Sequence, residues 1–149
     1  MSTFVFTLLT NNPDAAQYES ACLGASSSTK LTDNDIGKCV KIAASNNYVL
    51  CATTNEIEGI LVATEATTYN DGFAFGTVQR RGRFEAKVGS NQSNTLDVGE
   101  LVVADTQAAI DTAGGAVVMT GTPATFKWRC IRIISGTGVA GDTVLIERV

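Results

Sequence analysis

The sequence contains no histidine, and proline occurs only twice among its 149 residues. Histidine is the commonest general base, the commonest metal ligand and the usual partner that activates a serine or cysteine nucleophile. A lysine or a helix N-terminus can also activate a cysteine, but none of the four cysteines stands at a predicted helix start. We therefore expect a protein that is not an enzyme and that has no catalytic residues, no metal site and no cofactor.

Charged residues are scarce and unbalanced. They make up 17% of the chain, and 15 acidic residues against 11 basic ones give a formal net charge of −4. The chain therefore lacks the long-range positive field that draws proteins to DNA, and we expect no nucleic-acid partner. The apolar run at residues 4–9 is too short to span a bilayer and lacks the basic flank and cleavage site of a signal peptide. We expect no membrane partner and expect folding in the cytoplasm.

Four cysteines occur at well separated positions, namely Cys22, Cys39, Cys51 and Cys130. They form no CxxC pair, so the sequence indicates neither a zinc ribbon nor a thioredoxin-type redox pair. We interpret all four as buried thiols that stay reduced.

Short apolar runs rich in Val, Ile and Thr recur through the chain, and 14 glycines separate them. This pattern is typical of strands joined by tight turns. We predict strands at residues 38–43, 48–53, 56–64, 101–105, 116–120, 126–135 and 143–149, and two more within residues 73–88 that bend at Gly76 and Gly82. The Ser-Asn-Asn segment between the first two suits a hairpin turn. With no long helix, the chain is predicted to be all-β, a small barrel or sandwich.

Alternation indicates which side chains face the core. Between residues 81 and 88 charged and apolar side chains alternate, which predicts a strand with one solvated face and one buried face. Phe84 then points into the core. Trp128 alternates with Phe126 and Cys130, so we interpret it as a core anchor rather than a platform for stacking sugars.

The first 30 residues differ from the rest. A β-prone stretch is broken at residues 11–14, where Asp14 could cap a short helix that ends at Gly24, and small polar residues follow. We predict an N-terminal arm or linker at residues 1–30 and a single β-barrel domain at residues 31–149. Since an extended arm can add a strand to a sheet edge, the candidate contact residues of the arm are Thr3, Phe4, Val5, Phe6 and Leu8.

Two pairs of carboxylates, Asp33 with Asp35 and Glu56 with Glu58, match the composition of an acid and base pair. Residues two apart on a strand lie on one face about 7 Å apart, and on a solvated face they are hydrated charges. We interpret both pairs in this way. The same interpretation applies to two residues that are too few and too scattered for a calcium loop, Asp105 and Asp111.

Residues 136–141, Gly-Thr-Gly-Val-Ala-Gly, match the GxGxxG fingerprint of dinucleotide-binding proteins. In those proteins the motif opens a helix whose N-terminal amides hold a pyrophosphate. Only eight residues follow here, and their pattern is that of a strand. We predict a glycine-rich turn between the last two strands.

Arg80, Arg81 and Arg83 form the only dense basic cluster in the sequence. Such a cluster suits either a solvated strand face or a contact with an acidic patch on a partner protein. No interleaved stacking aromatics accompany it, which disfavours nucleic acid. These three arginines are therefore the candidate interface residues of the folded domain.

The order of several motifs resembles that of capsid decoration proteins, also called cement proteins, of tailed bacteriophages. The opening half of the resemblance consists of LTDNDIGK at residues 31–38, EGILV at residues 58–62 and DGFAFGTVQ at residues 71–79. The second half consists of VGELVVAD at residues 98–105, the glycine-rich residues 136–141 and the closing DTVLI at residues 142–146. The resemblance covers residues 31–149, and it is carried by the order of these motifs.

The resemblance implies a small β-barrel or β-tulip-like sandwich with an extended N-terminal arm. It also implies a homotrimer that binds the major capsid protein on the outer capsid surface of the virion, ties neighbouring capsomers together and has no small-molecule substrate. A receptor- or carbohydrate-binding β-domain of a phage head fibre or tail is the alternative, and it requires that Trp128, Tyr48 and Tyr69 face solvent. A tail-tube or head-completion role shares the same β-rich composition.

Overall fold

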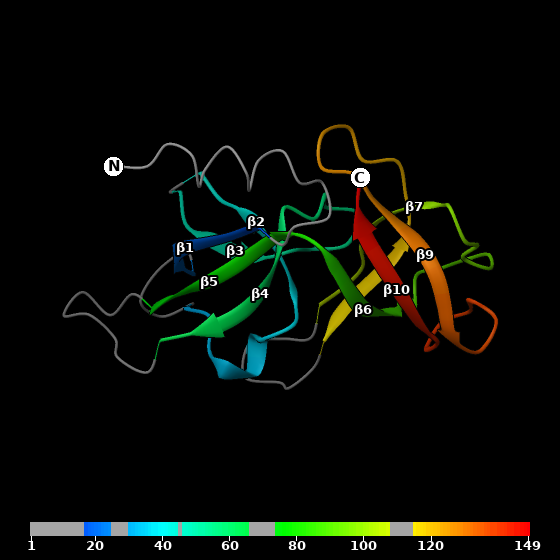
Figure 1. Ribbon diagram of the computed structural model, residues 1–149, viewed down its shortest axis with the longest axis horizontal. Helices are drawn as coiled ribbons and strands as arrows, with labels where there is room; N and C mark the ends of the chain where they lie inside the picture. The colour runs from blue at the N-terminus through cyan, green and yellow to red at the C-terminus, as the bar shows by residue number, and fades with distance from the viewer. Residues whose placement is uncertain (1–16, 25–29, 45, 66–73, 108–114) are drawn as a thin grey trace.

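The computed structural model describes residues 17–24, 30–44, 46–65, 74–107 and 115–149 (Figure 1). These residues form ten strands and one short 3-10 helix, η1, at Asp33–Asp35. The strands are β1 Gln17–Leu23, β2 Cys39–Ile42, β3 Tyr48–Leu50, β4 Gly59–Thr64, β5 Ala74–Arg81, β6 Arg83–Val88, β7 Leu101–Ala104, β8 Ala116–Thr120, β9 Trp128–Ser135 and β10 Thr143–Arg148. The prediction of an all-β barrel fold is confirmed.

The first five strands close into one barrel in the order β1-β3-β2-β4-β5. Closure comes from β1, which runs parallel to β3 on one side and antiparallel to β5 on the other. The interior of this barrel is filled by Leu23, Leu31, Val40, Tyr48, Leu61, Ala74 and Val78, all of which are buried. The barrel therefore has a core of its own.

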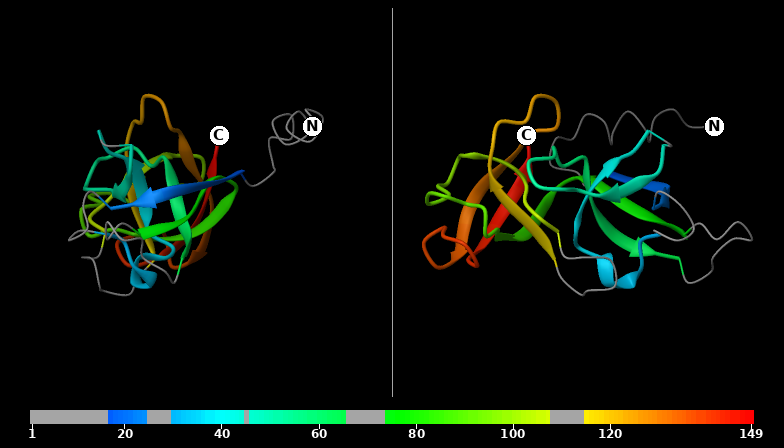
Figure 2. Two further views of the ribbon diagram at one scale, coloured as in Figure 1. Left: turned by 90° about the vertical axis from the view of Figure 1, so that its left-hand side faces the viewer. Right: turned by 180° about the vertical axis from the view of Figure 1, so that it is seen from behind.

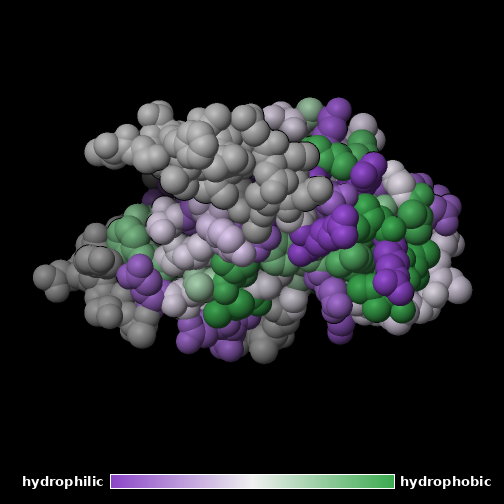
Figure 3. Space-filling model, in the orientation of Figure 1, coloured by the Kyte–Doolittle hydropathy of each residue, from purple (hydrophilic) through white to green (hydrophobic). Residues whose placement is uncertain are grey.

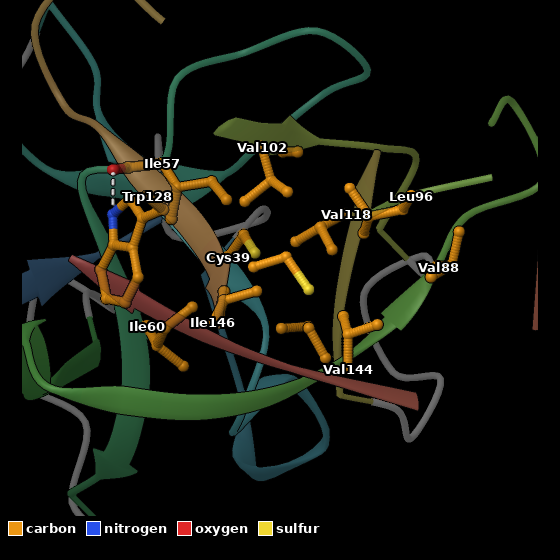
Figure 4. Packing of buried hydrophobic residues seen from close by; sticks show 14 of the residues in the cluster. Cys39, Ile57, Ile60, Val88, Leu96, Val102, Val118, Trp128, Val144 and Ile146 are labelled. Atoms are coloured by element: carbon orange, nitrogen blue, oxygen red, sulfur yellow. Dashed lines mark hydrogen bonds between the residues drawn. The ribbon is translucent and has the colours of Figure 1, made fainter. Parts of the chain in front are cut away.

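The last five strands close into a second barrel in the order β10-β6-β8-β7-β9. The parallel pair β6 and β8 completes a ring whose other neighbours are antiparallel. Its core includes Trp128, together with Cys39, Ile57 and Ile60 from the first half of the chain (Figure 4). This larger hydrophobic cluster is therefore shared between the two barrels.

The two barrels lie end to end, and the chain passes between them at Gly82 (Figures 1 and 2). β5 belongs to the first barrel, and β6, which is separated from β5 by the single residue Gly82, belongs to the second. Gly82 has a φ of 117°, which is a backbone conformation that L side chains rarely adopt. The sequence pattern predicted one barrel over residues 31–149, whereas the strands pair into two closed barrels. Strand patterns indicate where strands lie but not which strands close into a ring.

The helix predicted between Asp14 and Gly24 is wrong over the described residues, because Gln17–Leu23 is strand β1. It pairs with β5 over its whole length and begins the first barrel. Gly24 ends the strand with a φ of 102°, and its amide donates a hydrogen bond to the carbonyl of Tyr48. Pairing with distant strands outweighs a weak local helix signal. Residues 1–16, with the start of the predicted helix, lie outside the described residues.

Several local predictions are confirmed. β2 and β3 form an antiparallel hairpin, and Asn46 in its turn has a φ of 61°. Outward residues of β6 are exposed, and Phe84 is partly buried against the core.

Gly76 does not break its strand, since it lies inside β5, where an added Cβ would collide with the carbonyl oxygen of Ala63. The absence of a side chain at Gly76 therefore allows β4 to lie close to β5, and the bend predicted at this glycine is not present.

Candidate functional site

The three candidate arginines lie where β5 passes into β6, at the junction of the two barrels. Arg80 and Arg81 end β5, and Arg83 begins β6. Arg81 and Arg83 are exposed, whereas Arg80 is only partly exposed. The structure therefore divides the sequence cluster into two outward residues and one residue that faces the junction.

Arg80 is bonded within the first barrel. Its Nη1 lies 3.1 Å from Oε2 of Glu19 on β1, and the same carboxylate oxygen accepts a hydrogen bond of 3.1 Å from the Tyr48 hydroxyl. Burial raises the pKa of Tyr48 to about 12, so this hydroxyl stays protonated near neutral pH and can donate to Glu19. Arg80 thus belongs to a polar group that joins β1, β3 and β5.

Sequence reasoning missed Arg148, which bonds across the junction. Its Nη1 donates to the carbonyl of Glu58 at 3.3 Å and to that of Arg80 at 3.2 Å, and its guanidinium lies 4.8 Å from the ring centre of Phe126. Burial, and then the nearby positive charges of Arg80 and Arg81, lower the pKa of Arg148 below its ordinary value. No local signal could reveal this role, because the Glu58 carbonyl lies 90 positions away in the sequence.

Glu56 holds the loop that carries Phe126. Its carboxylate accepts backbone hydrogen bonds from Ala124 at 2.6 Å, from Thr125 at 3.1 Å and from Phe126 at 2.9 Å. The bond from Phe126 is the main cause that lowers the pKa of this carboxyl. The prediction that Glu56 is a hydrated charge is therefore wrong, since main-chain amides are its partners.

Trp128 completes the junction. Its side chain is fully buried, and Nε1 donates a hydrogen bond of 2.9 Å to the carbonyl of Ile57, 71 residues earlier (Figure 4). The prediction that Trp128 is a core anchor is confirmed. Glu56, Ile57 and Glu58 thus lie against residues 124–128 and Arg148, and these contacts join the barrels.

The remaining predicted carboxylates are mostly structural. Glu58 accepts the amide hydrogen bond of Ile42, so it is not merely hydrated. Asp35 is fully buried and forms an ion pair of 2.6 Å with Lys38, which is also fully buried. The second carboxylate oxygen of Asp35 accepts a hydrogen bond of 2.9 Å from the Thr32 amide. Asp33 is exposed, and its carboxylate accepts a hydrogen bond from the Thr64 hydroxyl. The hydrated-charge interpretation of Asp35 is therefore wrong, because a 3-10 turn brings Lys38 back onto it.

Asp105 is also buried, contrary to prediction. Burial raises its pKa, but hydrogen bonds from the side chain and amide of Asn91 and from the amide of Thr106 outweigh this effect and lower the pKa below its ordinary value. Asp105 therefore anchors the loop after β6, and Asp111 lies outside the described residues. Within the described ranges, no group of three or more Cys, Asp or Glu side chains is arranged to hold a metal ion.

The glycine-rich residues 136–141 form the turn between β9 and β10, as predicted. The carboxylate of Asp142 accepts amide hydrogen bonds from Thr137, Gly138 and Val139 at 2.7–3.0 Å. These bonds, first that of Thr137, lower the pKa of Asp142. The amides of the motif therefore bind a side chain of the protein itself.

The four cysteines are free. Cys39, Cys51 and Cys130 are buried, as predicted, whereas Cys22 is partly exposed. Burial raises the pKa values of the three buried thiols, that of Cys51 to about 12. These three thiols are therefore protonated and poor nucleophiles at neutral pH.

A shallow recess lies at the far end of the second barrel. It has a volume of about 550 Å³ and is lined by Gln92, Ser93, Asn94, Thr95, Asp97, Val139 and Ala140, so no aromatic ring borders it. Trp128 and Tyr48, which the carbohydrate-binding alternative requires at the surface, are buried, and Tyr69 lies outside the described residues. The arm candidates Thr3, Phe4, Val5, Phe6 and Leu8 lie outside them as well. No described helix is long and apolar enough to cross a membrane.

Comparisons with protein-family models, curated proteins and solved structures gave no match to this chain.

Proposed function

We propose that the protein is a non-enzymatic structural protein of a tailed bacteriophage that binds the outer capsid surface and ties neighbouring capsomers together. Its partner is the major capsid protein, it acts as a homotrimer, and it resides on the virion after synthesis in the host cytoplasm. The motif order over residues 31–149 is the sequence support for this proposal.

The observation that carries the proposal is the bonded junction of the two barrels. Trp128, Arg148 and Glu56 each bond across the junction, and one hydrophobic cluster includes residues of both halves of the chain. Densely packed interiors deform little and transmit strain. A body of this kind suits a protein that carries load between two attachment points.

The mechanism is adhesion. Packaged DNA pushes the shell outward, and a bound protein that spans two capsomers adds interface area that must be broken before they separate. Linking three copies converts modest single-site affinity into long residence, provided that all sites engage together. Strand addition by residues 3–9 would supply affinity through the backbone.

The direct test mixes the purified protein with undecorated expanded capsids of the phage that encodes it and images the particles. Ordered density on the outer surface, together with increased resistance of the shell to heat, is the expected result. Bare capsids at micromolar protein concentration would overturn the proposal.

Two further measurements test its parts. Light scattering should give a trimeric mass for the protein in solution or for the protein released from capsids, and a strictly monomeric mass would reject the trimer. Deleting residues 1–12 should leave the barrels folded but weaken capsid binding, and unchanged occupancy would reject the role of the arm.

A further inference from the structure

The outer surface of the second barrel carries a basic face, formed by the outward side chains of the adjacent strands β6, β10 and β9. Alternate residues of β6 and β10 are buried, and the residues between them point outward. Trp128 and Cys130 point inward on β9, so the residues on either side of Trp128 face solvent. Six exposed basic residues lie on this β6–β10–β9 face or at its edge: Arg83, Lys87, Arg129 and Arg132 on the strands, Arg81 at the end of β5, and Lys127 just before β9.

This face is positively charged, although the chain as a whole is negatively charged. The face with its edge holds six of the 11 basic residues, whereas Glu85 and Glu147 are the only acidic residues on it among those that the structure describes, although the net charge of the chain is −4. Glu147 bridges Arg83 at 3.1 Å and Arg129 at 3.6 Å, and so fixes both guanidinium groups. No ion pair among the described residues involves Lys87, Lys127 or Arg132, so their charges remain available to a partner.

Apolar side chains lie between the charges. Leu145 sits between Glu85 and Arg132 in the strand register and is partly exposed. Ile134 on β9 is 44% exposed and Val149, after β10, is 55% exposed. Figure 3 shows hydrophobic and hydrophilic residues interleaved over the right-hand lobe, where Figure 1 places β9 and β10. Arginine beside exposed aliphatic side chains is typical of protein interfaces.

Nucleic acid fits this face less well. Glu85 and Glu147 would repel a phosphate backbone, and the outward residues of β6, β9 and β10 include no aromatic side chain on which a base could stack. A protein patch with carboxylates around an apolar centre matches both the charges and the aliphatic strip. The charge complementarity therefore favours a protein partner.

We propose that the β6–β10–β9 face docks onto an acidic patch of a partner protein, which, on the function proposed above, is the major capsid protein. The face then determines where and in which orientation the second barrel sits on the shell. Because its charges are solvated, they steer the encounter and make binding sensitive to salt.

The test compares three proteins for binding to undecorated expanded capsids of the encoding phage: the wild type, Lys87→Glu/Arg132→Glu and the control Lys30→Glu/Lys41→Glu. Both double variants change the net charge equally, but Lys41 lies on β2 of the first barrel and Lys30 precedes that strand, so neither belongs to β6, β9 or β10. The face variant should bind at least about tenfold more weakly, equivalent to about 1.4 kcal/mol, and with a smaller salt dependence. The control should bind like the wild type. Thermal unfolding of each protein reports whether it is folded.

Each outcome decides between the two proposals. If the wild type binds capsids and the face variant binds equally well, or if both variants are weakened alike, the face is not the docking surface and the cement function stands. If the wild type does not bind capsids, both proposals fall. The face variant could instead keep its capsid binding but lose a salt-sensitive oligomer that the wild type forms, which would assign the face to a second copy of the chain. It could also keep its capsid binding but lose binding to duplex DNA, which would assign the face to DNA. Either result would overturn the proposed partner.

Discussion

Replacing Trp128 with phenylalanine should destabilise both barrels together, because its indole joins the second barrel to the segment before β4. The substitution keeps an aromatic ring in the core but removes the hydrogen bond of 2.9 Å to the Ile57 carbonyl. It also leaves a gap beside Phe84, whose ring centre lies 6.2 Å from that of Trp128. The effect therefore measures both packing and the polar contact of the junction.

The magnitude follows from these two losses. A buried carbonyl that loses its donor costs about 1–3 kcal/mol, and the gap left by the smaller ring costs about 1 kcal/mol more. The free energy of unfolding should fall by about 2–4 kcal/mol. In a protein of 149 residues each kcal/mol shifts Tm by about 2–4 °C, so Tm should fall by between about 4 and 16 °C.

Far-UV circular dichroism is the suitable assay, since Trp128 is the only tryptophan and its replacement removes the fluorescence probe. The wild type and the variant should each unfold in one transition, because one hydrophobic cluster includes residues of both barrels. Tyr18→Phe is the matched control, since Tyr18 is 60% exposed and should change stability by less than about 0.5 kcal/mol. A Tm within about 2 °C of the wild type, or two separate transitions in the wild type, would refute the reasoning.

Three further predictions concern other parts of the molecule. Arg148→Ala should lower the free energy of unfolding in urea by about 1–3 kcal/mol, because two carbonyls lose a charged donor, and a change below about 0.5 kcal/mol would contradict the role of Arg148. At pH 8, Cys39 and Cys51 should react with a thiol reagent far more slowly than the partly exposed Cys22, since burial raises their pKa values; equal rates in peptide mass mapping would contradict this. The lowered pKa of Asp142 means that its stabilisation is present above the ordinary carboxyl pKa of about 4 and is lost as the pH falls through the lower folded pKa. Asp142→Asn should therefore lose less stability than the wild type between about pH 4 and pH 2, and an identical acid profile would reject this contribution.

The features that could be predicted from the sequence are those set by neighbouring residues. The hairpin at Asn46 and the turn at residues 136–141 depend on backbone conformations that Asn and Gly adopt easily. The outward charged residues of β6, which are Arg83, Glu85 and Lys87, follow from strict alternation along one strand. In each case the physical cause lies within a few residues, so the sequence pattern indicates it directly.

The features that could not be predicted depend on distant partners. Glu56 looked like a hydrated charge because the amides that it binds lie about 70 residues later. Arg148 showed no local signal at all, since its two acceptors are carbonyls 90 and 68 positions earlier in the sequence. The number of barrels depends on the parallel pairs that β3 forms with β1 and β8 forms with β6, and such pairs leave no mark in either strand alone.

The β1–β5–β6 connection gives the two proposed contact regions a common mechanical path. Residues 1–16, which include the candidate arm, precede β1 directly, and β1 pairs with β5 at seven positions. β5 continues through Gly82 into β6, one strand of the basic face. In this register Gln17, at the start of β1, pairs with Arg81, at the end of β5, so the end of the candidate arm and the edge of the basic face lie at the same end of the β1–β5 pair. A load applied between an attached arm and an attached face would therefore open this pair from that end, one hydrogen bond after another, so the bonds nearest Gln17 and Arg81 would be the first to bear it.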